Sequence, residues 1–463
     1  MQYQFKISSQ LHQTIYNHLL PGDGLEAVGI ILCGFNQNIN RWTLLAKEFH
    51  PIDYNDCVRG GDFVHWKTEL IVHLLEKANK ELLAVLKIHS HPGGYDQFSW
   101  IDDESDQQLL PSLYGWIDGE QPHGSCVMLP SGEIFGRIAT ENGDFIFFDK
   151  VLVAGDDIKI WPRHKQGNST LENEITLRTR QTLGDGTATI LKSLKVGVVG
   201  ASGTGSPVIE QLARLGVGEI IICDPDVIEY KNLNRILNST LFHAENQVKK
   251  VDVMKESIAR LGLDIKVTVY ASNLYDSRDA IIDLSSCDVL FGCMDSIDGR
   301  HLLNQLATFY IIPYFDLGIK IEADGNGGIE QINGVVHFLK PGGSSLFTRG
   351  TYSLDILQAA GLKRKNPDEF TKRLAEKYIV NLPVDRPAVI SINMQIASTA
   401  VNEFLDRIHR FKNSNPSSRA SIWISVTEDL IFCEGDGQPD FYLQKRVGRG
   451  DMIPFLEMPD LQL

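Results

Sequence analysis

The clearest alternation of apolar and polar positions lies in the stretch from Leu194 to Arg235. The β-branched run Lys195–Val199 predicts a buried strand. Apolar residues at helical spacing after Ser206-Pro207 predict a helix, which Gly216 or Gly218 would end. The run Glu219–Cys223 predicts a second strand. Three glycines form a G-x-x-G-x-G turn between the first strand and the helix, namely Gly200, Gly203 and Gly205.

The remainder of the second half continues this alternation of strands and helices. Strands are expected at 288–293, 314–319 and 334–338, and a helix at 298–310. Beyond residue 412, two short apolar runs at 421–426 and 430–433 predict a β-rich tail. The pattern therefore predicts an α/β domain followed by a β-rich extension.

The first 150 residues form a unit of their own. Strands are predicted at Ala27–Cys33 and Leu83–His91, a helix at Leu70–Ala78, and a further helix that opens at Ser99. Trp161-Pro162 and the following polar residues predict a linker. We therefore expect four segments, at 1–150, 151–175 (the linker), 176–412 and 413–463.

The composition indicates a globular chain. The formal net charge of −15 argues against partners with anionic surfaces, so we expect neither nucleic-acid nor membrane binding. The N-terminus has no basic segment followed by an apolar core, and no apolar run approaches the length of a membrane span. The seven cysteines are scattered, which fits free thiols and the cytoplasm.

The glycine turn predicts a nucleotide site. Glycines let phosphate oxygens approach bare backbone N–H groups. Asp224 follows the second strand, where a carboxylate can accept a hydrogen bond from a ribose hydroxyl. A dehydrogenase would need only these features, but here they are followed by DPDVIEYKNLNR, then QVKKVD at 247–252 and FGCMDSIDGR at 291–300.

This set of motifs resembles the ThiF/MoeB superfamily of ubiquitin-activating-type adenylating enzymes, over roughly residues 171–412. The segment 381–404 likewise resembles the family's P-A-x-x-x-x-N segment followed by a long closing helix. The resemblance implies a Rossmann-like doubly wound domain that binds ATP and Mg²⁺, and a homodimer. It assigns ribose binding to Asp224 and magnesium to Asp295. It implies contacts to the nucleotide from the following residues: Asn232, Arg235, Lys249 and, from the other subunit, Arg180. Taken singly, Arg235 or Lys249 is a surface charge and Asp295 a helix cap.

A second constellation, HSHPGGYDQFSWIDD, predicts a metal site in the first unit. His89 and His91 lie two residues apart, so on a strand they project from the same face. With Asp102 they form the donor set of a catalytic zinc whose fourth position is left to water. The alternative is that Ser99 and Asp102 only begin a helix, because S-x-x-D resembles a capping box.

The pattern H-x-H-P-x₆-S-x₂-D with an upstream glutamate resembles the JAB/MPN (JAMM) metalloproteases, over about residues 1–145. These enzymes cleave isopeptide or peptide bonds next to ubiquitin-like proteins. The resemblance implies an α/β domain of cytidine-deaminase-like fold with three zinc ligands, His89, His91 and Asp102. It implies that Glu26 is the general base and that Ser99 helps to hold the oxyanion.

Two departures from the ThiF/MoeB pattern are visible. Relatives often carry a structural zinc on two C-x-x-C pairs, but the corresponding places here are Ser345–Thr348 and Phe441–Gln444. We therefore expect no structural zinc. Ubiquitin-type activators also use a cysteine between strand four and the closing helix, yet no cysteine occurs from Met294 to Phe432. Cys433 is the one later candidate, and transfer to a partner's thiol, amine or sulfur donor is favoured.

Together the resemblances imply a bifunctional enzyme of a bacterial ubiquitin-like modification pathway, some examples of which are linked to antiphage defence. Its partners would be a β-grasp protein with a C-terminal glycine and a ubiquitin-conjugating-like enzyme. Two alternatives remain open. One is activation of a sulfur carrier for cofactor or metabolite synthesis, and the other is a scaffold with one inactive centre.

Overall fold

The structure is a computed structural model that describes residues 1–163, 174, 177–324, 328–375 and 389–461. It divides into two compact units. Unit 1 comprises Met1–Gln166, Phe309–Ile311 and Arg446–Glu457, and unit 2 comprises the rest. Both units contain a large mixed sheet with helices, so the predicted α/β class is confirmed. Among the described residues, no helix is long and apolar enough to cross a membrane.

Unit 1 is built on a nine-stranded sheet with the order β11-β10-β1-β3-β2-β6-β7-β8-β9. The strands are β1 (Gln2–Ser8), β2 (Val28–Asn38), β3 (Arg41–Pro51), β6 (Ala84–Ser90), β7 (His123–Met128), β8 (Ile134–Ala139), β9 (Phe145–Phe147), β10 (Lys150–Ala154) and β11 (Ile158–Pro162). A separate hairpin pairs β4 (Cys57–Arg59) with β5 (Val64–Trp66). The helices are α1 (Ser9–Leu19), α2 (Val72–Glu81) and α3 (Trp100–Trp116).

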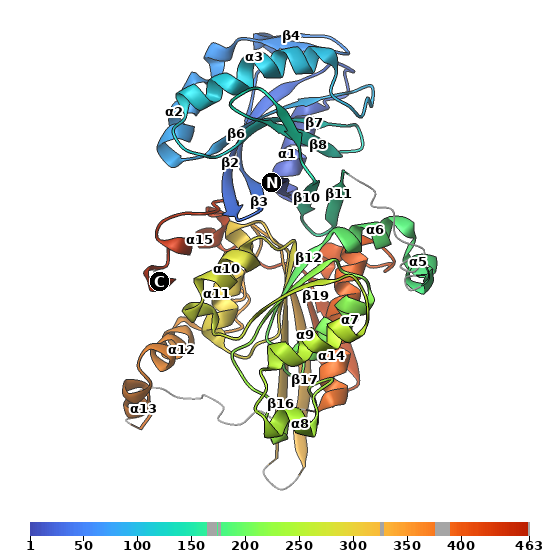
Figure 1. The fold of residues 1–463 in the computed structure, drawn as a ribbon, viewed down its shortest axis with the longest axis vertical. Coiled ribbons are helices and arrows are strands. Elements are labelled where there is room, and N and C mark those ends of the chain that lie inside the picture. Colours follow the sequence, from blue (N-terminus) through green and yellow to red (C-terminus); the bar gives the residue numbers. More distant parts are fainter. Residues whose placement is uncertain (164–173, 175–176, 325–327, 376–388, 462–463) are drawn as a thin grey trace. The chain divides into compact units, whose positions relative to one another are not determined.

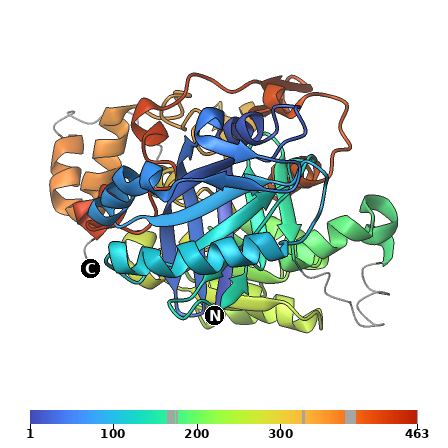
Figure 2. The same ribbon diagram turned by 90° about the horizontal axis from the view of Figure 1, so that it is seen from above.

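The sheet of unit 1 has a core on each face. One core includes Ile15 and Leu19 of α1, and the other includes Leu74 of α2 and Leu110 of α3. Figure 2 shows α3 running along its face of the sheet. Because both faces are covered, central strands such as β6 are buried throughout and appear in the sequence as continuous apolar runs.

The predicted linker is wrong for residues 151–162. β10 and β11 extend the sheet, with β10 parallel to β1 and antiparallel to β11. Val151, Leu152 and Val153 are buried, so sheet pairing and burial outweigh the breaking signal of Trp161-Pro162. The proline falls on the last residue of β11, where its missing N–H is tolerated.

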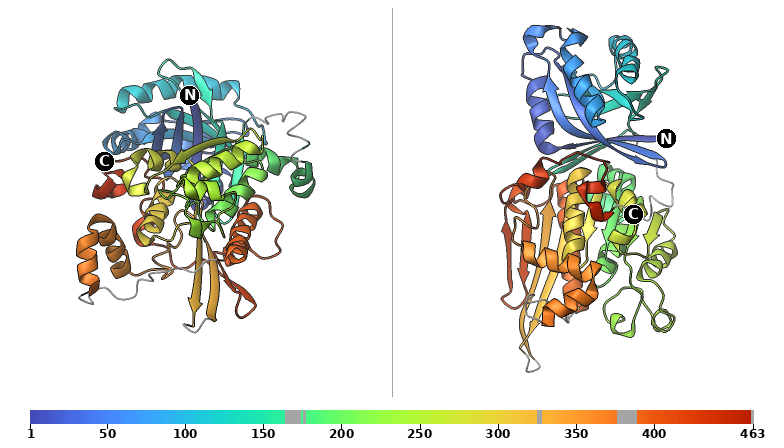
Figure 3. Two further views of the ribbon diagram at one scale, coloured as in Figure 1. Left: turned by 60° about the horizontal axis from the view of Figure 1, so that its bottom comes forward. Right: turned by 90° about the vertical axis from the view of Figure 1, so that its left-hand side faces the viewer.

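Unit 2 contains an eight-stranded sheet with the order β14-β13-β12-β15-β16-β17-β18-β19. The strands are β12 (Lys195–Val199), β13 (Glu219–Cys223), β14 (Lys266–Tyr270), β15 (Val289–Gly292), β16 (Tyr314–Ala323), β17 (Ile329–Leu339), β18 (Ser421–Ser425) and β19 (Leu430–Glu434). The first five in this order pair in parallel and the rest antiparallel. Figure 3 shows β16 and β17 as a long hairpin. The predicted doubly wound half and the two tail strands are confirmed.

Helices precede the first strand of unit 2, occupy most connections between its strands and follow its last strand. They are α5 (Leu177–Leu183), α6 (Asp185–Ser193), α7 (Gly205–Arg214), α8 (Leu241–Glu245), α9 (Lys250–Arg260), α10 (Arg278–Ser285), α11 (Ile297–Phe309), α12 (Leu354–Lys365), α13 (Pro367–Ala375), α14 (Ile390–Ile408) and α15 (Phe441–Gln444). The strand order reverses beside β12, and β15 is its neighbour on the other side. Ligands of such sheets bind at the carboxyl ends of strands at this switch point.

The residues expected in one C-terminal extension, 413–463, fall in both units. β18 and β19 complete the sheet of unit 2, whereas Arg446–Glu457 belongs to unit 1. In unit 1, Asp451 accepts hydrogen bonds from Gln37 N at 2.8 Å and Asn36 Nδ2 at 3.1 Å. Gly450 has φ +68°, and a Cβ there would lie 2.2 Å from the carbonyl oxygen of Phe35. This close approach therefore requires glycine.

The two places where relatives would carry C-x-x-C pairs are joined by hydrogen bonds. Ser345 Oγ donates to Asp440 Oδ2 at 2.6 Å. Asp440 also caps α15, because its other oxygen accepts from Tyr442 N at 3.0 Å and Leu443 N at 3.1 Å. A polar link therefore connects the Ser345–Thr348 and Phe441–Gln444 segments.

Candidate functional sites

The structure brings together the three predicted zinc ligands. His89 lies near the end of β6, His91 directly follows that strand, and Asp102 lies in the first turn of α3. Nε2 of His89 lies 2.8 Å from Asp102 Oδ1, and Nε2 of His91 lies 3.4 Å from Oδ2. The two imidazole nitrogens are 3.2 Å apart. All three residues are buried, and their ligand atoms lie within 4.8 Å of one another.

The chemistry of these donors fits zinc. His91 Nδ1 contacts the carbonyl oxygen of Tyr95 at 2.7 Å, which favours the tautomer with a proton on Nδ1 and leaves the Nε2 lone pair for a metal. Burial acts to raise the pKa of Asp102, but hydrogen bonds from His89 and His91 outweigh burial and hold this pKa well below its usual range. The carboxylate is therefore anionic, as a ligand must be.

Ser99 supports Asp102. Both N and Oγ of Ser99 donate to Asp102 Oδ2 at 2.7 Å, while Asp102 N donates to Ser99 Oγ at 3.2 Å. The capping box considered as an alternative is therefore present. It does not exclude the metal site, because the same geometry orients Asp102 Oδ1 toward His89.

Glu26 lies beside these residues, two positions before the first residue of β2. Its Oε1 is 3.9 Å from His91 Nε2, and burial raises the pKa of its carboxyl to about 7. The backbone of Glu26 is fixed by the β4–β5 hairpin, since Glu26 N donates to Gly60 O at 2.8 Å and Arg59 Nε donates to Glu26 O at 2.7 Å. A carboxyl group with such a pKa can accept and return a proton near neutral pH.

A cavity of about 660 Å³ adjoins this cluster. Glu26, His89 and Asp102 contribute to its wall, and so does Lys87 of β6. Apolar side chains from β5, α2 and α3 line much of the remainder, including Trp66, Val72, Leu75, Leu109, Leu113 and Trp116. A cavity of this size, lined by apolar side chains with a few polar groups, is typical of a ligand-binding site.

Unit 2 has a second cavity, of about 550 Å³, at the switch point of its sheet. Six of the residues predicted from the sequence line it, namely Gly200, Gly203, Asp224, Asn232, Arg235 and Asp295. Gly200 has φ +98°, and a Cβ there would lie 2.6 Å from the carbonyl oxygen of Cys293. Gly205 begins α7, where a Cβ would lie 1.7 Å from Gly200 O. The turn therefore needs glycine at both positions.

Asp224 is held at the end of β13 by the glycine turn. Its Oδ2 accepts from Ala201 N at 2.7 Å and its Oδ1 from Asp226 N at 2.9 Å. Burial raises the pKa of this carboxyl, and the charge of Lys250 acts in the opposite direction. A buried carboxylate in this position can accept a hydrogen bond from a ribose hydroxyl.

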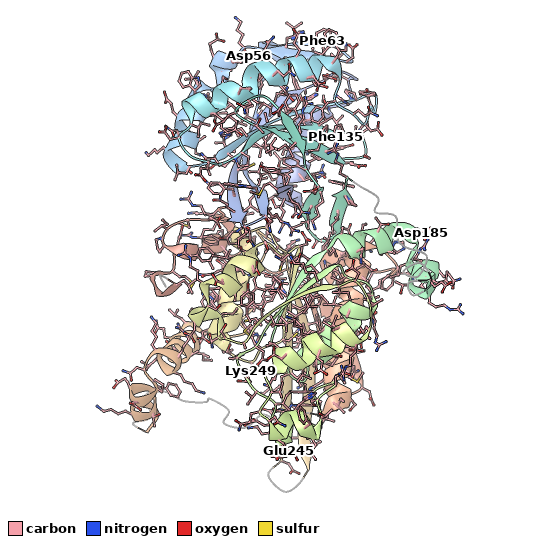
Figure 4. All side chains as sticks on the ribbon, in the orientation of Figure 1. Asp56, Phe63, Phe135, Asp185, Glu245 and Lys249 are labelled. Carbon is pink, nitrogen blue, oxygen red and sulfur yellow. The ribbon has the colours of Figure 1, made fainter. Side chains whose placement is uncertain are left out.

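The structure places Lys250, and not the predicted Lys249, in the wall of the cavity. Lys249 is the N-cap of α9, and its Nζ donates to Pro225 O at 2.9 Å (Figure 4). Nζ of Lys250 pairs with Asp226 at 2.7 Å and lies 3.9 Å from Asp224. Lys250 lies on the same face of α9 as the buried Val253 and Met254, three and four residues further on. This helical spacing could have identified Lys250, rather than Lys249, as the inward-facing lysine.

The two predicted arginines lie in different surroundings. Arg235 lines the cavity, and its Nη1 donates to Lys231 O at 2.8 Å. Arg180 lies in α5, where its Nε donates to Asp185 at 2.6 Å, and it is not among the residues that line this cavity. Asp185 is labelled in Figure 4.

The sequence analysis also missed other residues of the cavity wall. Arg300 forms a buried ion pair with Asp316, whose Oδ1 also accepts from the Tyr314 hydroxyl at 2.7 Å. Asn393 of α14 completes the wall. Asn393 is the last residue of the P-A-x-x-x-x-N motif, whose first two residues lie outside the described part of the chain. This motif is the sequence feature from which Asn393 could have been predicted.

A doubly wound sheet with a glycine turn and a second unit with a His-His-Asp cluster together define the class of protein. Residues 176–425 match the model of the ThiF family, and residues 8–135 match that of prokaryotic homologs of the JAB domain. The chain belongs to the ThiF family and carries a JAB domain at its N-terminal side.

Curated relatives resemble part of the chain. The ubiquitin-like modifier-activating enzyme 5 of Drosophila willistoni is 25% identical over 170 residues, which make up 34% of this chain and 39% of that protein. The adenylyltransferase and sulfurtransferase UBA4 of Yarrowia lipolytica is 33% identical over 145 residues, or 31% of this chain and 35% of that protein. The chain therefore spans less than half the length of these relatives.

Solved structures also resemble it. The crystal structure of E. coli MccB is 22% identical, with a TM-score of 0.42, and the match covers 60% of this chain and 74% of that one.

Proposed function

We propose that this chain acts on the C-terminal tail of a ubiquitin-like protein at two centres, an adenylating centre in unit 2 and a zinc-dependent peptidase centre in unit 1. The presence of a ThiF family match and a JAB match in one chain is the observation that carries the proposal. The named relatives include activating enzymes of ubiquitin-like modifiers, which supports a ubiquitin-like protein with a C-terminal glycine as substrate.

In the adenylating centre, a carboxylate oxygen of the terminal glycine attacks the α-phosphorus of ATP. The bond from that phosphorus to the bridging oxygen breaks, and pyrophosphate leaves. The N–H groups of the glycine turn donate hydrogen bonds to the phosphates, and Asp224 accepts a hydrogen bond from a ribose hydroxyl. Lys250 and Arg235 offset the charge that develops on the phosphates. Asp295 offers the oxygen ligand for Mg²⁺, which would neutralise further phosphate charge.

Arg180 is proposed to act on the phosphates of the other subunit of a homodimer. Arg180 does not line the cavity of its own chain, which supports a contact with the nucleotide bound by the other subunit. Exchange of Arg180 for alanine should lower adenylation, and mixing this variant with an Asp295→Ala variant should restore part of the activity by forming heterodimers with one intact centre.

In the peptidase centre, His89, His91 and Asp102 would hold the zinc ion, which supplies a Lewis acid and lowers the pKa of water. Glu26 takes the proton from the attacking water and delivers it to the leaving amine. Ser99 fixes Asp102, and its hydroxyl would donate to the developing oxyanion only after it turns away from Asp102 Oδ2. The adjoining cavity of unit 1 receives the extended tail.

Transfer of the activated tail to a partner, rather than to a cysteine of this chain, is proposed for the next step. Cys433 of β19 is exposed, but burial of its thiol raises its pKa, which lowers the thiolate fraction. Cys223, at the end of β13, is buried, and burial raises its pKa to about 12. A ubiquitin-conjugating-like enzyme or an amine is then the acceptor.

Sulfur transfer is the second candidate, because UBA4 is named as both adenylyltransferase and sulfurtransferase. In that case sulfide displaces AMP from the adenylate and yields a thiocarboxylate. Mass spectrometry of the modifier distinguishes the two, since conjugation gives an amide and sulfur transfer replaces one oxygen by sulfur.

The test is exchange of radiolabelled pyrophosphate into ATP, with a panel of ubiquitin-like proteins that end in glycine. We expect exchange that depends on one of these proteins and is lost in the Asp295→Ala variant. Exchange that survives in Asp295→Ala would contradict the proposed centre. A chain that binds these proteins with no exchange and no cleavage would instead be a scaffold.

A further inference from the structure

A buried cluster of three charged side chains lies beside the candidate metal centre of unit 1. Asp106 of α3 is entirely buried, Lys87 of β6 is 4% exposed and Arg137 of β8 is 2% exposed. Nζ of Lys87 lies 2.5 Å from Asp106 Oδ1. Nε and Nη2 of Arg137 donate to Asp106 Oδ2 at 3.1 and 2.7 Å. One carboxylate therefore joins two cations from two strands.

Arg137 is itself held firmly. The carbon of its guanidinium lies 3.8 Å from the ring centroid of Phe98 and 3.7 Å from that of Phe145. Its Nη1 pairs with Asp103, the residue after Asp102. Arg137 thus forms ion pairs with two carboxylates of the first half of α3 and fixes this part of the helix against the sheet.

The cluster repeats the geometry of the metal site one step further along both elements. Lys87 and His89 are two residues apart on β6, so they project from the same face. Asp102 and Asp106 are four residues apart on α3, so they also share a face. The Lys87–Asp106 pair therefore bridges β6 and α3 beside the His89–Asp102 pair, at 2.5 and 2.8 Å.

We propose that Lys87, Asp106 and Arg137 form a positioning cluster that sets the distance between α3 and β6, so that Asp102 reaches the metal together with His89 and His91. This inference rests on the proposed metal centre. None of the three residues is assigned as a ligand.

A metal site requires a well-defined distance between α3 and β6, and this requirement explains why charged side chains are buried here. A metal site tolerates deviations of only about 0.2 Å in its ligand distances, so a small displacement of α3 weakens binding. Apolar packing would stabilise the helix with less loss of hydration, but it does not fix direction and distance as the Lys87–Asp106 ion pair and the two hydrogen bonds from Arg137 to Asp106 do. Residues that orient metal ligands commonly change metal affinity 10- to 100-fold when they are replaced.

The decisive variant is Lys87→Met, which keeps most of the length of the side chain, removes its charge and leaves Asp106 paired with Arg137. The probe is Co²⁺, titrated into the full-length apoprotein and followed by its visible d–d absorption. We expect at least about tenfold weaker binding and a changed spectrum. Electrostatics alone predicts the opposite, since loss of a neighbouring cation should tighten the binding of a dication.

Two controls separate position from stability. Lys87→Arg keeps the ion pair and should bind Co²⁺ within about threefold of the wild type. Leu110 is fully buried and lies one turn of α3 beyond Asp106. Leu110→Ala therefore opens a cavity that destabilises α3 and leaves the three residues of the cluster unchanged. Its Co²⁺ affinity should remain unchanged. If Lys87→Met does not fold, Lys87→Gln provides the same comparison.

Unchanged or tighter Co²⁺ binding in folded Lys87→Met would overturn the positioning role while leaving the metal centre intact. A Co²⁺ affinity reduced as much in Leu110→Ala as in Lys87→Met would also overturn it. Wild-type protein that binds no Co²⁺ would overturn the metal centre itself, and the inference with it.

Discussion

Replacement of Lys250 by alanine, compared with replacement of its neighbour Lys249, tests which lysine serves the triphosphate. Lys250 lines the cavity and lies 3.9 Å from Asp224. Lys249 instead donates to the carbonyl oxygen of Pro225. The two variants remove the same charge from adjacent residues, so each is the control for the other.

The expected loss of activity follows from the charge that Lys250 would present to a phosphate bound in the cavity. One unit charge at 4 Å from another is worth about 4 kcal/mol at an effective dielectric constant of about 20. Loss of a single preorganised donor to developing charge commonly costs about 10²- to 10³-fold in rate, or about 2.7–4 kcal/mol. We therefore expect kcat/KM for pyrophosphate exchange to fall by about 10²- to 10³-fold in Lys250→Ala.

Lys249→Ala loses one hydrogen bond of a partly exposed side chain, so its kcat/KM should stay within about threefold of the wild type. The assay is pyrophosphate exchange at saturating modifier, with ATP varied to separate kcat from KM. Equal losses in both variants, or a larger loss in Lys249→Ala, would refute the assignment of Lys250.

Four further predictions address the two centres and the stability of unit 1. Glu26→Gln should abolish cleavage of a modifier fusion while zinc content, measured by atomic absorption, stays at one per chain; retained cleavage would exclude Glu26 as the base. Asp295→Ala should abolish exchange but leave cleavage intact, and loss of both would contradict separate centres. Gly200→Ala should weaken ATP binding by calorimetry at least tenfold, because its φ of +98° disfavours a Cβ that would also meet Cys293 O. Burial lowers the pKa of His123 to about 4. The folded state therefore binds fewer protons than the unfolded state, and about 3 kcal/mol of stability present above pH 6.5 should be lost as the pH falls toward 4. His123→Gln should flatten this profile in urea unfolding, and an unchanged profile would contradict it.

Much of the fold and of both sites could be predicted because chemistry was encoded in short local motifs. The glycine turn after Lys195–Val199 fixes its own geometry, and the same holds for two histidines that are two residues apart at the end of a strand. Asp102 could be placed because a capping box makes the start of α3 visible in the sequence. These features depend on neighbours within a few residues, which a sequence pattern contains.

The features that were missed depend on distant pairing. β10 and β11 form because β1 offers a free edge about 150 positions earlier in the chain, which no local signal in 150–162 reveals. The motif does not distinguish Lys249 from Lys250, because the two lysines are adjacent, and only the helix phase of α9 places Lys250 in the cavity wall. The pairing of Lys87 with Asp106 and Arg137 likewise joins three elements that only the fold brings together.

The most direct test of the account uses one ubiquitin-like protein in two forms, one that ends in glycine and one extended beyond that glycine by a short peptide. The account predicts that the wild-type chain with zinc and Mg-ATP trims the second form at the glycine and adenylates the first. It also predicts that Glu26→Gln loses only trimming and Asp295→Ala only adenylation. If a modifier that supports adenylation is never cleaved in its extended form, the claim that both centres act on the same tail is contradicted.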